Sequence, residues 1–328
     1  MVLCYATVTV HGPRILRPTC RQGAAPRVAP ARRASVPGVE VAVVVTAHDQ
    51  REQVAAAVAS VRAQTTPCAE LVVVDDGSTD AASLAVLDRL RADGVRVLRQ
   101  DDAGVGAARN AGIAATRAPL VLVLDGDDRV APTFLARVAP LLADPGAVAA
   151  SSWLVLFGVA SGVVRPGGGT LVDFLHRNAC PGSAVLRRAA WERAGGYDEA
   201  MRSGFEDWDL YLGMLAGGGR VAVAPEPLLE YRTAPASANV RSMEHRLALF
   251  RGLVGKHRAA YEAHLADVLV AQEATAVRRL GDWEALVAAD PALPLVQPTF
   301  GDGGMAAHVR VATARASRAE RVPDASGE

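Results

Sequence analysis

Residues Leu120–Asp128 read LVLVLDGDD, an apolar run that ends in three carboxylates. Its five apolar residues lie between Pro119 and a glycine-containing turn, which is too short for a helix and typical of a buried strand. Ligands bind at the carboxyl ends of strands in an open α/β sheet. We therefore expect Asp125, Asp127 and Asp128 at a functional edge, where a divalent cation would relieve their mutual repulsion. The alternative is an acidic turn that caps the next helix.

Strand and helix patterns alternate upstream of this stretch. The first expected helix carries Val54, Val58 and Val61 on one face. The second begins near Asp80, with Ser78 or Thr79 as its expected cap. The alternation predicts right-handed crossovers and an α/β fold with four parallel strands. The expected strands are residues 40–49, 71–74, 95–98 and 120–124. The expected helices are residues 49–64, a helix that begins at 78–80 and has Leu84, Leu87 and Leu90 as apolar positions, and residues 106–115.

Parallel strands end at one edge of a sheet, so the polar residues that follow each strand should meet there. The residues concerned are His48 and Asp49 after the first strand, Asp75 and Asp76 after the second, and Asp125–Asp128 after the fourth. The sequence therefore predicts an acidic crevice at this edge.

The composition limits the class of protein. The chain has 328 residues, half of them apolar and few aromatic, as in a globular protein. Residues 1–39 hold six Arg and no acid, so the remainder carries 29 basic against 35 acidic side chains. That balance argues against a nucleic-acid partner. The four cysteines form neither a CxxC pair nor a zinc spacing, so we expect a reducing compartment, either the cytoplasm or the inner face of the membrane.

The segments outside the alternating region carry little chemistry. Residues 1–39, rich in Arg, Pro and Ala, are expected to be disordered. The uncharged run Gly146–Val164 is long enough to span a bilayer, but its glycines and serines favour two short strands joined by a turn, so no transmembrane segment is expected. The expected domains are residues 40–235 for the α/β domain, 236–290 for a helical extension of two helices, and 291–328 for a loosely structured tail.

Two other α/β enzyme classes were tested against the motifs. The nearest match to a dinucleotide-binding GxGxxG is Gly104-Val-Gly106-Ala-Ala-Arg109, which has Arg in place of the third glycine and follows the third strand instead of the first. A phosphatase with an aspartyl nucleophile would need Thr or Val where Arg129 stands, so this class remains only as an alternative.

Five segments together carry a resemblance to a known family. They are EVAVVVTAHD (40–49), ELVVVDDGSTD (70–80), DDAGVGAARNAGI (101–113), LVLVLDGDD (120–128) and GFEDWDLYLGML (204–215). In order and spacing they resemble the motifs of family 2 glycosyltransferases of the GT-A fold. The resemblance covers Val41 to Arg232. It implies a Rossmann-like, mostly parallel sheet flanked by helices, with a C-terminal helical extension.

The resemblance also implies roles for particular residues. The end of the first strand and the DDGS turn would bind the nucleotide, with Thr46, His48 and Asp49 around its base and ribose and Asp76 accepting a hydrogen bond from the base. The AARN helix start would lie beside the nucleotide or its sugar. The segment NACPGSAVLRR would line the donor sugar and the acceptor opening, although a tight turn before a strand explains it equally well. The implied binding residues are Thr46, His48, Asp49, Asp76, Arg109, Asn110, Asp125, Gly182 and Ser183.

The family's DxD motif corresponds to Asp125 and Asp127, which would bind the ribose and a Mg²⁺ or Mn²⁺ that bridges the two phosphates. Asp128 is an alternative ligand. A His often follows the family's Tyr-Arg pair, but Thr233 stands there in this chain, which weakens the case for a third protein ligand. His245 is the remaining candidate for that position.

The acceptor hydroxyl needs a base on the opposite face of the sugar. The apolar spacing in FEDWDLYLGML predicts a helix with Glu206 and Asp207 at its N-terminal end, pointing out of the core. By resemblance Asp207 is the base and the outcome is inversion, with Glu206 and Asp209 as other candidates. The alternative is that these acids only cap the helix dipole.

The sequence thus predicts a metal-dependent, inverting glycosyltransferase. Its donor would be a nucleotide-diphosphate sugar, and its acceptor a carbohydrate, a lipid-linked molecule or another hydroxyl compound. The other hypothesis is a non-catalytic, GT-A-like module that binds sugar nucleotides.

Overall fold

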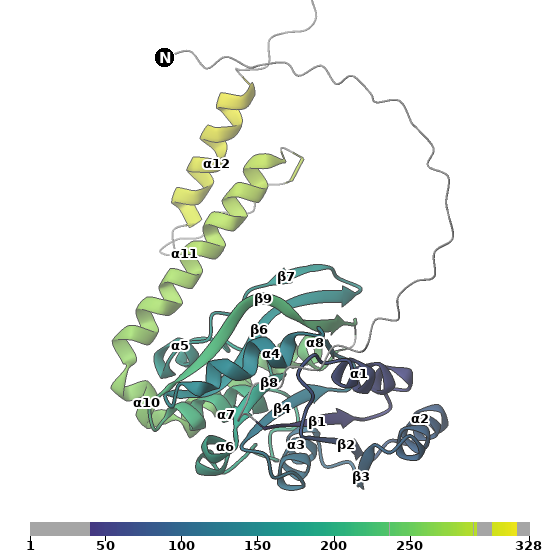
Figure 1. Cartoon of the computed structure of the whole chain (residues 1–328). Coiled ribbons are helices and arrows are strands. Elements are labelled where there is room, and N and C mark those ends of the chain that lie inside the picture. The colour runs from purple at the N-terminus through teal and green to yellow at the C-terminus, as the bar shows by residue number, and fades with distance from the viewer. Residues whose placement is uncertain (1–39, 236, 291, 294–303, 320–328) are drawn as a thin grey trace, which may run out of the picture. The chain divides into compact units, whose positions relative to one another are not determined.

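The computed structural model describes residues 40–235, 237–290, 292–293 and 304–319. The expectation of disorder for residues 1–39 lies outside the described residues. The first half of the described chain alternates strands and helices, as the apolar patterns predict (Figure 1). These elements are β1 (Val41–Ala47), α1 (Glu52–Arg62), β2 (Glu70–Asp76), α2 (Ala81–Ala92), β3 (Arg96–Gln100), α3 (Val105–Ala114) and β4 (Leu120–Asp125).

The second half adds strands of both directions and more helices. Its elements as far as the closing strand are β5 (Arg129–Val130), α4 (Phe134–Val138), the 3-10 helix η1 (Ala139–Ala143), β6 (Ala147–Gly158), β7 (Gly162–Val164), α5 (Leu171–Leu175), β8 (Ala184–Arg187), α6 (Arg188–Ala194), α7 (Glu206–Leu215) and β9 (Arg220–Thr233). The helices that follow are α8 (Ala238–Ser242), the 3-10 helix η2 (Met243–His245), α9 (Arg246–Lys256), α10 (Arg258–Ala263), α11 (Leu265–Ala289) and α12 (Gly304–Ala319).

Among the described residues, nine strands form one sheet in the order β3-β2-β1-β4-β8-β6-β9-β5, with β7 paired to β6. Strands β3, β2, β1 and β4 run parallel to one another, which confirms the expected parallel core. Strand β8 is antiparallel to both β4 and β6, and β9 is parallel to β6. The expected pair of strands in Gly146–Val164 is confirmed as the antiparallel hairpin β6–β7.

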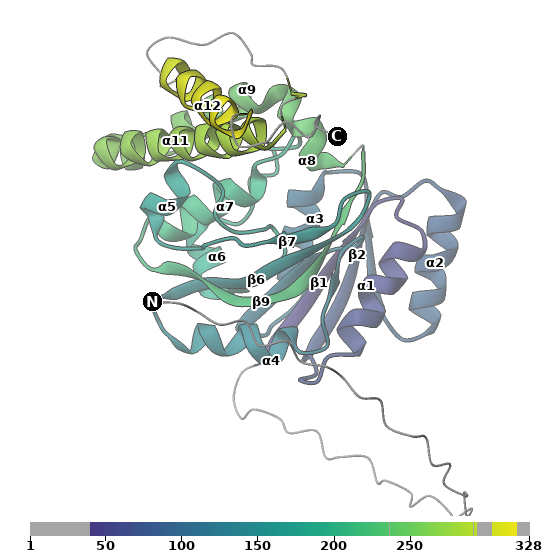
Figure 2. The same cartoon turned by 90° about the horizontal axis from the view of Figure 1, so that it is seen from above.

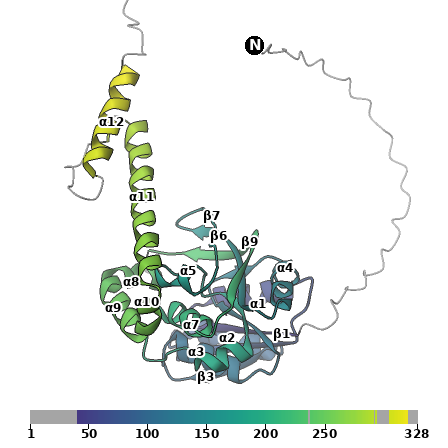
Figure 3. The same ribbon diagram turned by 90° about the vertical axis from the view of Figure 1, so that its left-hand side faces the viewer.

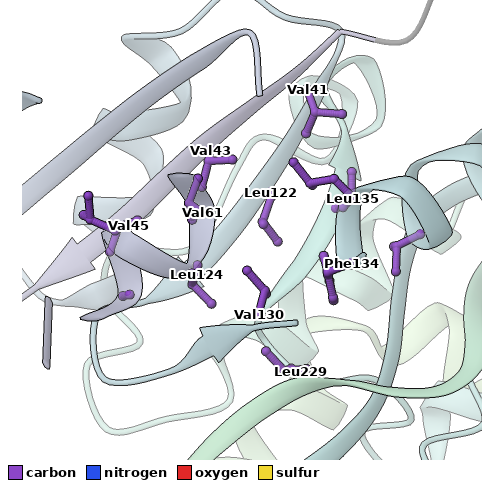
Figure 4. Packing of buried hydrophobic residues seen from close by; sticks show 14 of the residues in the cluster. Val41, Val43, Val45, Val61, Leu122, Leu124, Val130, Phe134, Leu135 and Leu229 are labelled. Atoms are coloured by element: carbon purple, nitrogen blue, oxygen red, sulfur yellow. The ribbon is translucent and has the colours of Figure 1, made fainter. Parts of the chain in front are cut away.

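Apolar side chains bury both faces of this sheet. In β1, Val41, Val43 and Val45 face one core cluster, whereas Ala42 and Val44 face the other. The first cluster lies under α1, α2 and α4, and Figure 4 shows how the side chains of β1 and β4 meet those of α1 and α4 in it. The second cluster lies under α3, α5, α6 and α7 on the opposite face (Figure 2). A strand buried on both faces reads as a continuous apolar run, which is the pattern seen in the sequence.

The second cluster extends beyond the boundary expected at residue 235. Leu253 of α9, Tyr261 of α10 and Val268 of α11 are buried in it together with residues of α7. The helices after the closing strand therefore complete the core of the sheet's second face.

Three local expectations need correction. The cap of α2 is Asp80, whose carboxylate accepts a hydrogen bond from the Ser83 N–H, and not Ser78 or Thr79. The expected two-helix extension is divided further, because the chain leaves helical geometry at His257 and His264. The tail expected to be loosely structured contains α12, which packs against α11 with Ala307 and Val311 buried.

None of the helices in the described part of the chain combines the length and the apolar character needed to cross a membrane.

Candidate active site

The candidate site lies where the strand order reverses. The chain builds outward from β1 to β2 and β3 and then returns to β4 on the other side of β1. In open α/β sheets, ligands bind at the carboxyl ends of the strands at such a reversal. Thr46 and Asp125 are register partners there, and the Thr46 hydroxyl donates to Asp125 Oδ1 over 3.5 Å.

Gly126 allows the β4 loop to pass close to the end of β1. A Cβ at this position would lie 2.4 Å from the Thr46 carbonyl oxygen and 2.2 Å from Gln50 Oε1. Real Cβ atoms do not approach other atoms so closely, so a residue with a side chain would push the loop outward. The glycine in DGDD is thus required by packing, and it keeps Asp125 and Asp127 close to β1.

Arg109 joins three elements at the centre of the site. It is 3% exposed, and its guanidinium donates from Nη2 to Asp125 Oδ1 and from Nη1 to Glu206 Oε1, both over 2.8 Å. The Tyr197 ring lies 5.2 Å from the guanidinium carbon. A buried cation needs such partners, and the planar fork of Arg can serve two carboxylates at once. Arg109 of α3 therefore connects this helix to β4 and α7. The resemblance had implied only that Arg109 lies beside the nucleotide or its sugar.

The three carboxylates after β4 have different surroundings. Asp127 is half-buried, and Nη1 of Arg232 lies 3.5 Å from its Oδ2. Burial and the charge of Asp125 raise the pKa of Asp127 above its ordinary value. Asp128 is only 2% exposed and accepts from the Arg232 N–H over 2.8 Å. Burial, followed by the charge of Asp125, raises the pKa of Asp128 well above its usual range. Asp125 and Asp127 thus form the accessible pair, whereas Asp128 is enclosed.

Within the described residues, no group of three or more His, Cys, Asp or Glu is arranged to hold a metal ion. His245 is exposed and belongs to no such group. The accessible donor set is therefore two carboxylates, Asp125 and Asp127.

Glu206 and Asp207 begin α7, and Phe205 before them has a left-handed φ of 71°. The expectation that both acids point out of the core is wrong for Glu206. Its side chain is buried, because Arg109 reaches it from α3 across the second face of the sheet. A left-handed non-glycine residue is strained and is common at functional sites.

Asp207 is held by its own helix and by a loop. Its Oδ1 accepts from the Trp208 N–H over 2.7 Å, and its Oδ2 accepts from Asn178 Nδ2 over 2.9 Å. Burial and the neighbouring charge of Glu206 raise the pKa of Asp207 to about 7. A carboxyl group with a pKa near neutrality is suited to take up a proton and to release it again.

Gly182 lies between Arg109 and Asp207. A Cβ added to it would lie 3.3 Å from Arg109 Nη2 and 3.4 Å from Asp207 Oδ2. Its neighbour Ser183 is buried, and the Ser183 hydroxyl lies 3.4 Å from Asp128 Oδ2. The structure therefore brings Gly182 close to both Arg109 and Asp207, and it directs the Ser183 hydroxyl toward Asp128.

The residues expected around the base and ribose hold the loops at the ends of β1 and β2. His48 Nδ1 lies 2.7 Å from the Asp76 carbonyl oxygen. Asp49 accepts from the N–H groups of Thr79 and Asp80, and the Asp80 contact is the main reason why the pKa of Asp49 is lowered. The Asp49 carboxylate is thus engaged with backbone, and its contact with a ribose stays a prediction.

The Asp76 carboxylate is likewise engaged with backbone. It accepts from the N–H groups of Ala103 and Gly104 and from Gln100 Nε2 over 2.8–2.9 Å. These bonds fix the turn that begins α3 and so position Arg109. Acceptance of a hydrogen bond from the base by Asp76 also stays a prediction.

Asn110 supports the loop behind Arg109. Its Nδ2 donates to the Tyr197 carbonyl and to Glu199 Oε1 over 2.9 Å, and its Oδ1 accepts from the Tyr197 N–H over 2.9 Å. Asn110 thereby holds Tyr197 against the guanidinium, while a direct contact between Asn110 and the nucleotide or sugar stays a prediction.

Three residues of the site received no individual role from the sequence. Asn178 holds Asp207, Tyr197 packs on Arg109, and Arg232 contacts Asp127 and Asp128. Asn178 lies in the segment NACPGSAVLRR and Arg232 in the Tyr231-Arg232 pair, both of which the resemblance singled out. Tyr197 lies in an irregular segment, where no apolar period indicates the direction of a side chain.

The geometry agrees with a comparison against protein families. Residues 42–193 match the model described as Glycosyl transferase family 2. This part of the chain is a family 2 glycosyltransferase domain. The expected resemblance to family 2 glycosyltransferases is thereby confirmed. The matched range contains Asp125, Asp127, Gly182 and Ser183. Helix α7, with Glu206 and Asp207, follows it.

Two proteins of Rhizobium meliloti (strain 1021) are similar in sequence to this chain. Succinoglycan biosynthesis protein ExoU is 32% identical over 210 residues, and succinoglycan biosynthesis protein ExoO is 34% identical over 206 residues. These alignments cover 56% and 57% of this chain. They cover 59% and 58% of the two relatives, so the chain spans less than two thirds of the length of either.

A solved structure resembles the family 2 domain together with the segments that follow it. The crystal structure of residues 1–349 of S. aureus TarS superposes with a TM-score of 0.54 at 17% sequence identity. The match covers 86% of this chain and 92% of that one. The likeness concerns the fold and confirms the GT-A class with its C-terminal helices.

Proposed function

We propose that the chain is a metal-dependent, inverting glycosyltransferase that moves a sugar from a nucleotide-diphosphate sugar to an acceptor hydroxyl. The observation that carries the proposal is the Arg109 bridge. It joins Asp125, at the strand end where a donor would bind, to Glu206, which precedes the candidate base Asp207. One buried guanidinium thereby links the proposed donor site to the start of the helix that carries the proposed base, a link that a non-catalytic binding module would not need.

The choice of donor is supported by the related proteins. S. aureus TarS has been solved in complex with UDP and with UDP-GlcNAc, and the two Rhizobium relatives are named for succinoglycan biosynthesis. We therefore propose a UDP-sugar as the first donor to test and a glycan as the first acceptor. The cytoplasm, or the inner face of the membrane, remains the proposed location.

The donor set after β4 fits a divalent cation. Mg²⁺ in nucleotide sites is usually held by one or two carboxylates together with the phosphates of the substrate. Asp125 and Asp127 supply such a pair, and Asp127 lies in a surrounding that disfavours an uncompensated negative charge. We propose that these two carboxylates hold Mg²⁺ or Mn²⁺; once bound, the ion stabilises negative charge on the departing diphosphate.

Asp207 is the proposed general base. Its carboxylate would take the proton from the acceptor hydroxyl as that oxygen attacks the anomeric carbon and the bond between the sugar and the phosphate breaks. Attack on the face opposite the leaving diphosphate gives inversion. Asn178 would keep Oδ2 of Asp207 in place during this step. Glu206 is not the proposed base, because its Oε1 already accepts a hydrogen bond from the Arg109 guanidinium.

The decisive experiment compares Asp207→Asn with Glu206→Gln. Asp207→Asn should bind a UDP-sugar with Mn²⁺ as the wild type does but lower kcat by about two to four orders of magnitude, the usual worth of a general base. Glu206→Gln should mainly lower stability, since it weakens the partner of a buried cation. Measurements of donor binding by thermal shift and of transfer to a glycan acceptor separate the two. Normal transfer by Asp207→Asn would remove the base assignment.

A parallel experiment tests the metal. Asp127→Asn should bind UDP equally well with and without Mn²⁺, whereas the wild type should bind more tightly with Mn²⁺. Metal-dependent binding that survives in Asp127→Asn would shift the ligand role to Asp125 or Asp128. Binding of UDP without any effect of Mn²⁺ or Mg²⁺ in the wild type would overturn the metal-dependent part of the proposal.

A further inference from the structure

Lys256, the one lysine of the chain, connects three segments. It ends α9, and its Nζ lies 2.6 Å from Asp198 Oδ2 and 2.8 Å from Asp209 Oδ2. The next residue, His257, places its Nε2 2.7 Å from the other oxygen of Asp209. Asp209 is 4% exposed, so its carboxylate depends on these two partners from beyond the closing strand.

Both acids that Lys256 holds lie next to parts of the candidate active site. Asp209 is two residues after Asp207 in α7. Asp198 directly follows Tyr197, whose ring lies against the Arg109 guanidinium. Figure 3 shows α9 and α10 beside α7, on the face of the sheet that carries α3. A single ammonium group therefore ties the helix of the proposed base and the loop behind the Arg109 bridge to the same point of α9.

The charges explain why a cation is needed at this point. Asp209 lies in the first turn of α7 with Glu206 and Asp207, so three carboxylates crowd one helix end. Arg109 compensates Glu206 from one side, and Lys256 compensates Asp209 from the other, where His257 adds a close contact to the same carboxylate. Without Lys256, the negative charge of Asp209 would act more strongly on Asp207, and α7 would lose its anchor to α9.

We propose that Lys256 is a positioning residue for sugar transfer, which acts through Asp209 and Asp198 to hold Asp207 and Arg109 in their working orientation. The inference rests on the proposed function. It assigns a role in transfer to α9, although α9 lies beyond the residues that match the family model.

The test compares Lys256→Met and Lys256→Arg with a matched control, Arg258→Met. Arg258 lies two residues further on and forms an exposed pair with Glu262, so its loss should change neither transfer nor stability noticeably. Lys256→Met should lower kcat by about tenfold to a hundredfold, the scale of effect that follows when a reacting group is misplaced by about 1 Å. Donor KM should stay near the wild-type value. The pH–rate profile should shift, so that kcat rises at a higher pH than in the wild type. Lys256→Arg should recover most of the loss.

A chemical experiment needs no substitution. Acylation of the folded wild type with an amine-selective reagent reaches only Lys256 and the N-terminal amine, and the Lys256 side chain is 44% exposed. We expect the acylated protein to lose kcat as predicted for Lys256→Met, whereas acylation of Lys256→Arg, which has no amine at this position, should change nothing further. This arm therefore remains decisive if Lys256→Met fails to fold.

Hydrogen exchange of α7 supplies a readout that does not need activity. Exchange in residues 206–215 should be faster in Lys256→Met than in Arg258→Met, with other helices unchanged. Equal transfer, equal pH profile and equal α7 exchange in these two variants would overturn the inference. A fall in kcat that merely follows a uniform loss of stability, without any change in the pH profile, would overturn it as well.

The outcomes also separate this inference from the proposed function. A wild-type chain that binds UDP-sugars but transfers none overturns the function and with it the role of Lys256 in transfer. Faster α7 exchange in Lys256→Met would then identify a purely structural link. Normal wild-type transfer that is equally fast in Lys256→Met overturns the positioning role alone.

Discussion

Asp207 is a carboxyl group of the candidate site whose pKa lies near neutrality. Burial and the charge of Glu206 raise that pKa to about 7, so at pH 6 most molecules carry the protonated, inactive form. A general base works only when deprotonated, so kcat should rise as pH increases through about 7 and then level off. A pH–rate profile at saturating donor checks this expectation. A profile that is flat from pH 5.5 to 8.5 would contradict it, provided that donor binding is unchanged over that range.

Arg109 should matter to stability as much as to chemistry. Replacing it by Met leaves the carboxylates of Glu206 and Asp125 without their shared partner, which typically costs about 3–5 kcal/mol when the pair is buried. Arg89→Met is the matched control, because Arg89 forms an exposed pair with Glu52 whose loss should cost less than about 1 kcal/mol. Urea denaturation of both variants measures the free energies of unfolding. Similar losses in the two would show that the Arg109 bridge contributes little to the fold.

At the scale of elements, α3 sits close to the sheet because of Gly112. A Cβ at Gly112 would lie 2.2 Å from Val44 Cγ1 and 3.0 Å from Val74 Cγ2, so Gly112 is the point of contact between α3 and strands β1 and β2. Gly112→Ala should lower the free energy of unfolding by about 1–3 kcal/mol through overpacking. It should also move the helix that carries Arg109, and so reduce donor binding.

Gly281 in α11 provides the matched control for that substitution. An added Cβ there meets nothing within 4 Å, so Gly281→Ala should stabilise the helix by up to about 1 kcal/mol. Thermal and urea unfolding of both variants compare the two helices directly. A stabilising Gly112→Ala would mean that α3 can shift away from β1 without loss.

For the whole molecule, the position of the C-terminal helices in the second core cluster predicts where the chain can be shortened. A chain that ends at Ser242 loses Leu253, Tyr261 and Val268 from that cluster together with the partners of Asp209. It should not unfold cooperatively near the wild-type Tm. A chain that ends at Asp290 keeps all of these contacts, and its Tm should fall by only a few degrees. Circular dichroism melts distinguish the two; a native-like Tm for the shorter chain would show that the first 242 residues are self-sufficient.

The parallel core and the acids at its edge were determined by the sequence itself. A continuous apolar run such as LVLVL indicates a strand that is buried on both faces, whatever the rest of the fold is. Parallel strands have their carboxyl ends at the same edge of the sheet. For this reason the parallel direction of β1 to β4 and the position of Asp125 at the edge where β1 and β2 also end could be predicted without any long-range contact.

The pairing of charges was decided by tertiary structure alone. Glu206 was expected to face outward. It is buried because Arg109, 97 residues earlier in the chain, contacts it from α3 on the same face of the sheet. Asp207 and Asp209 look alike in FEDWD, but one is held by Asn178 beside Gly182 and the other is enclosed by Lys256 and His257. A local pattern tells which side of a helix is apolar. It contains no information about which distant cation will compensate a buried carboxylate, because that depends on how the helices pack.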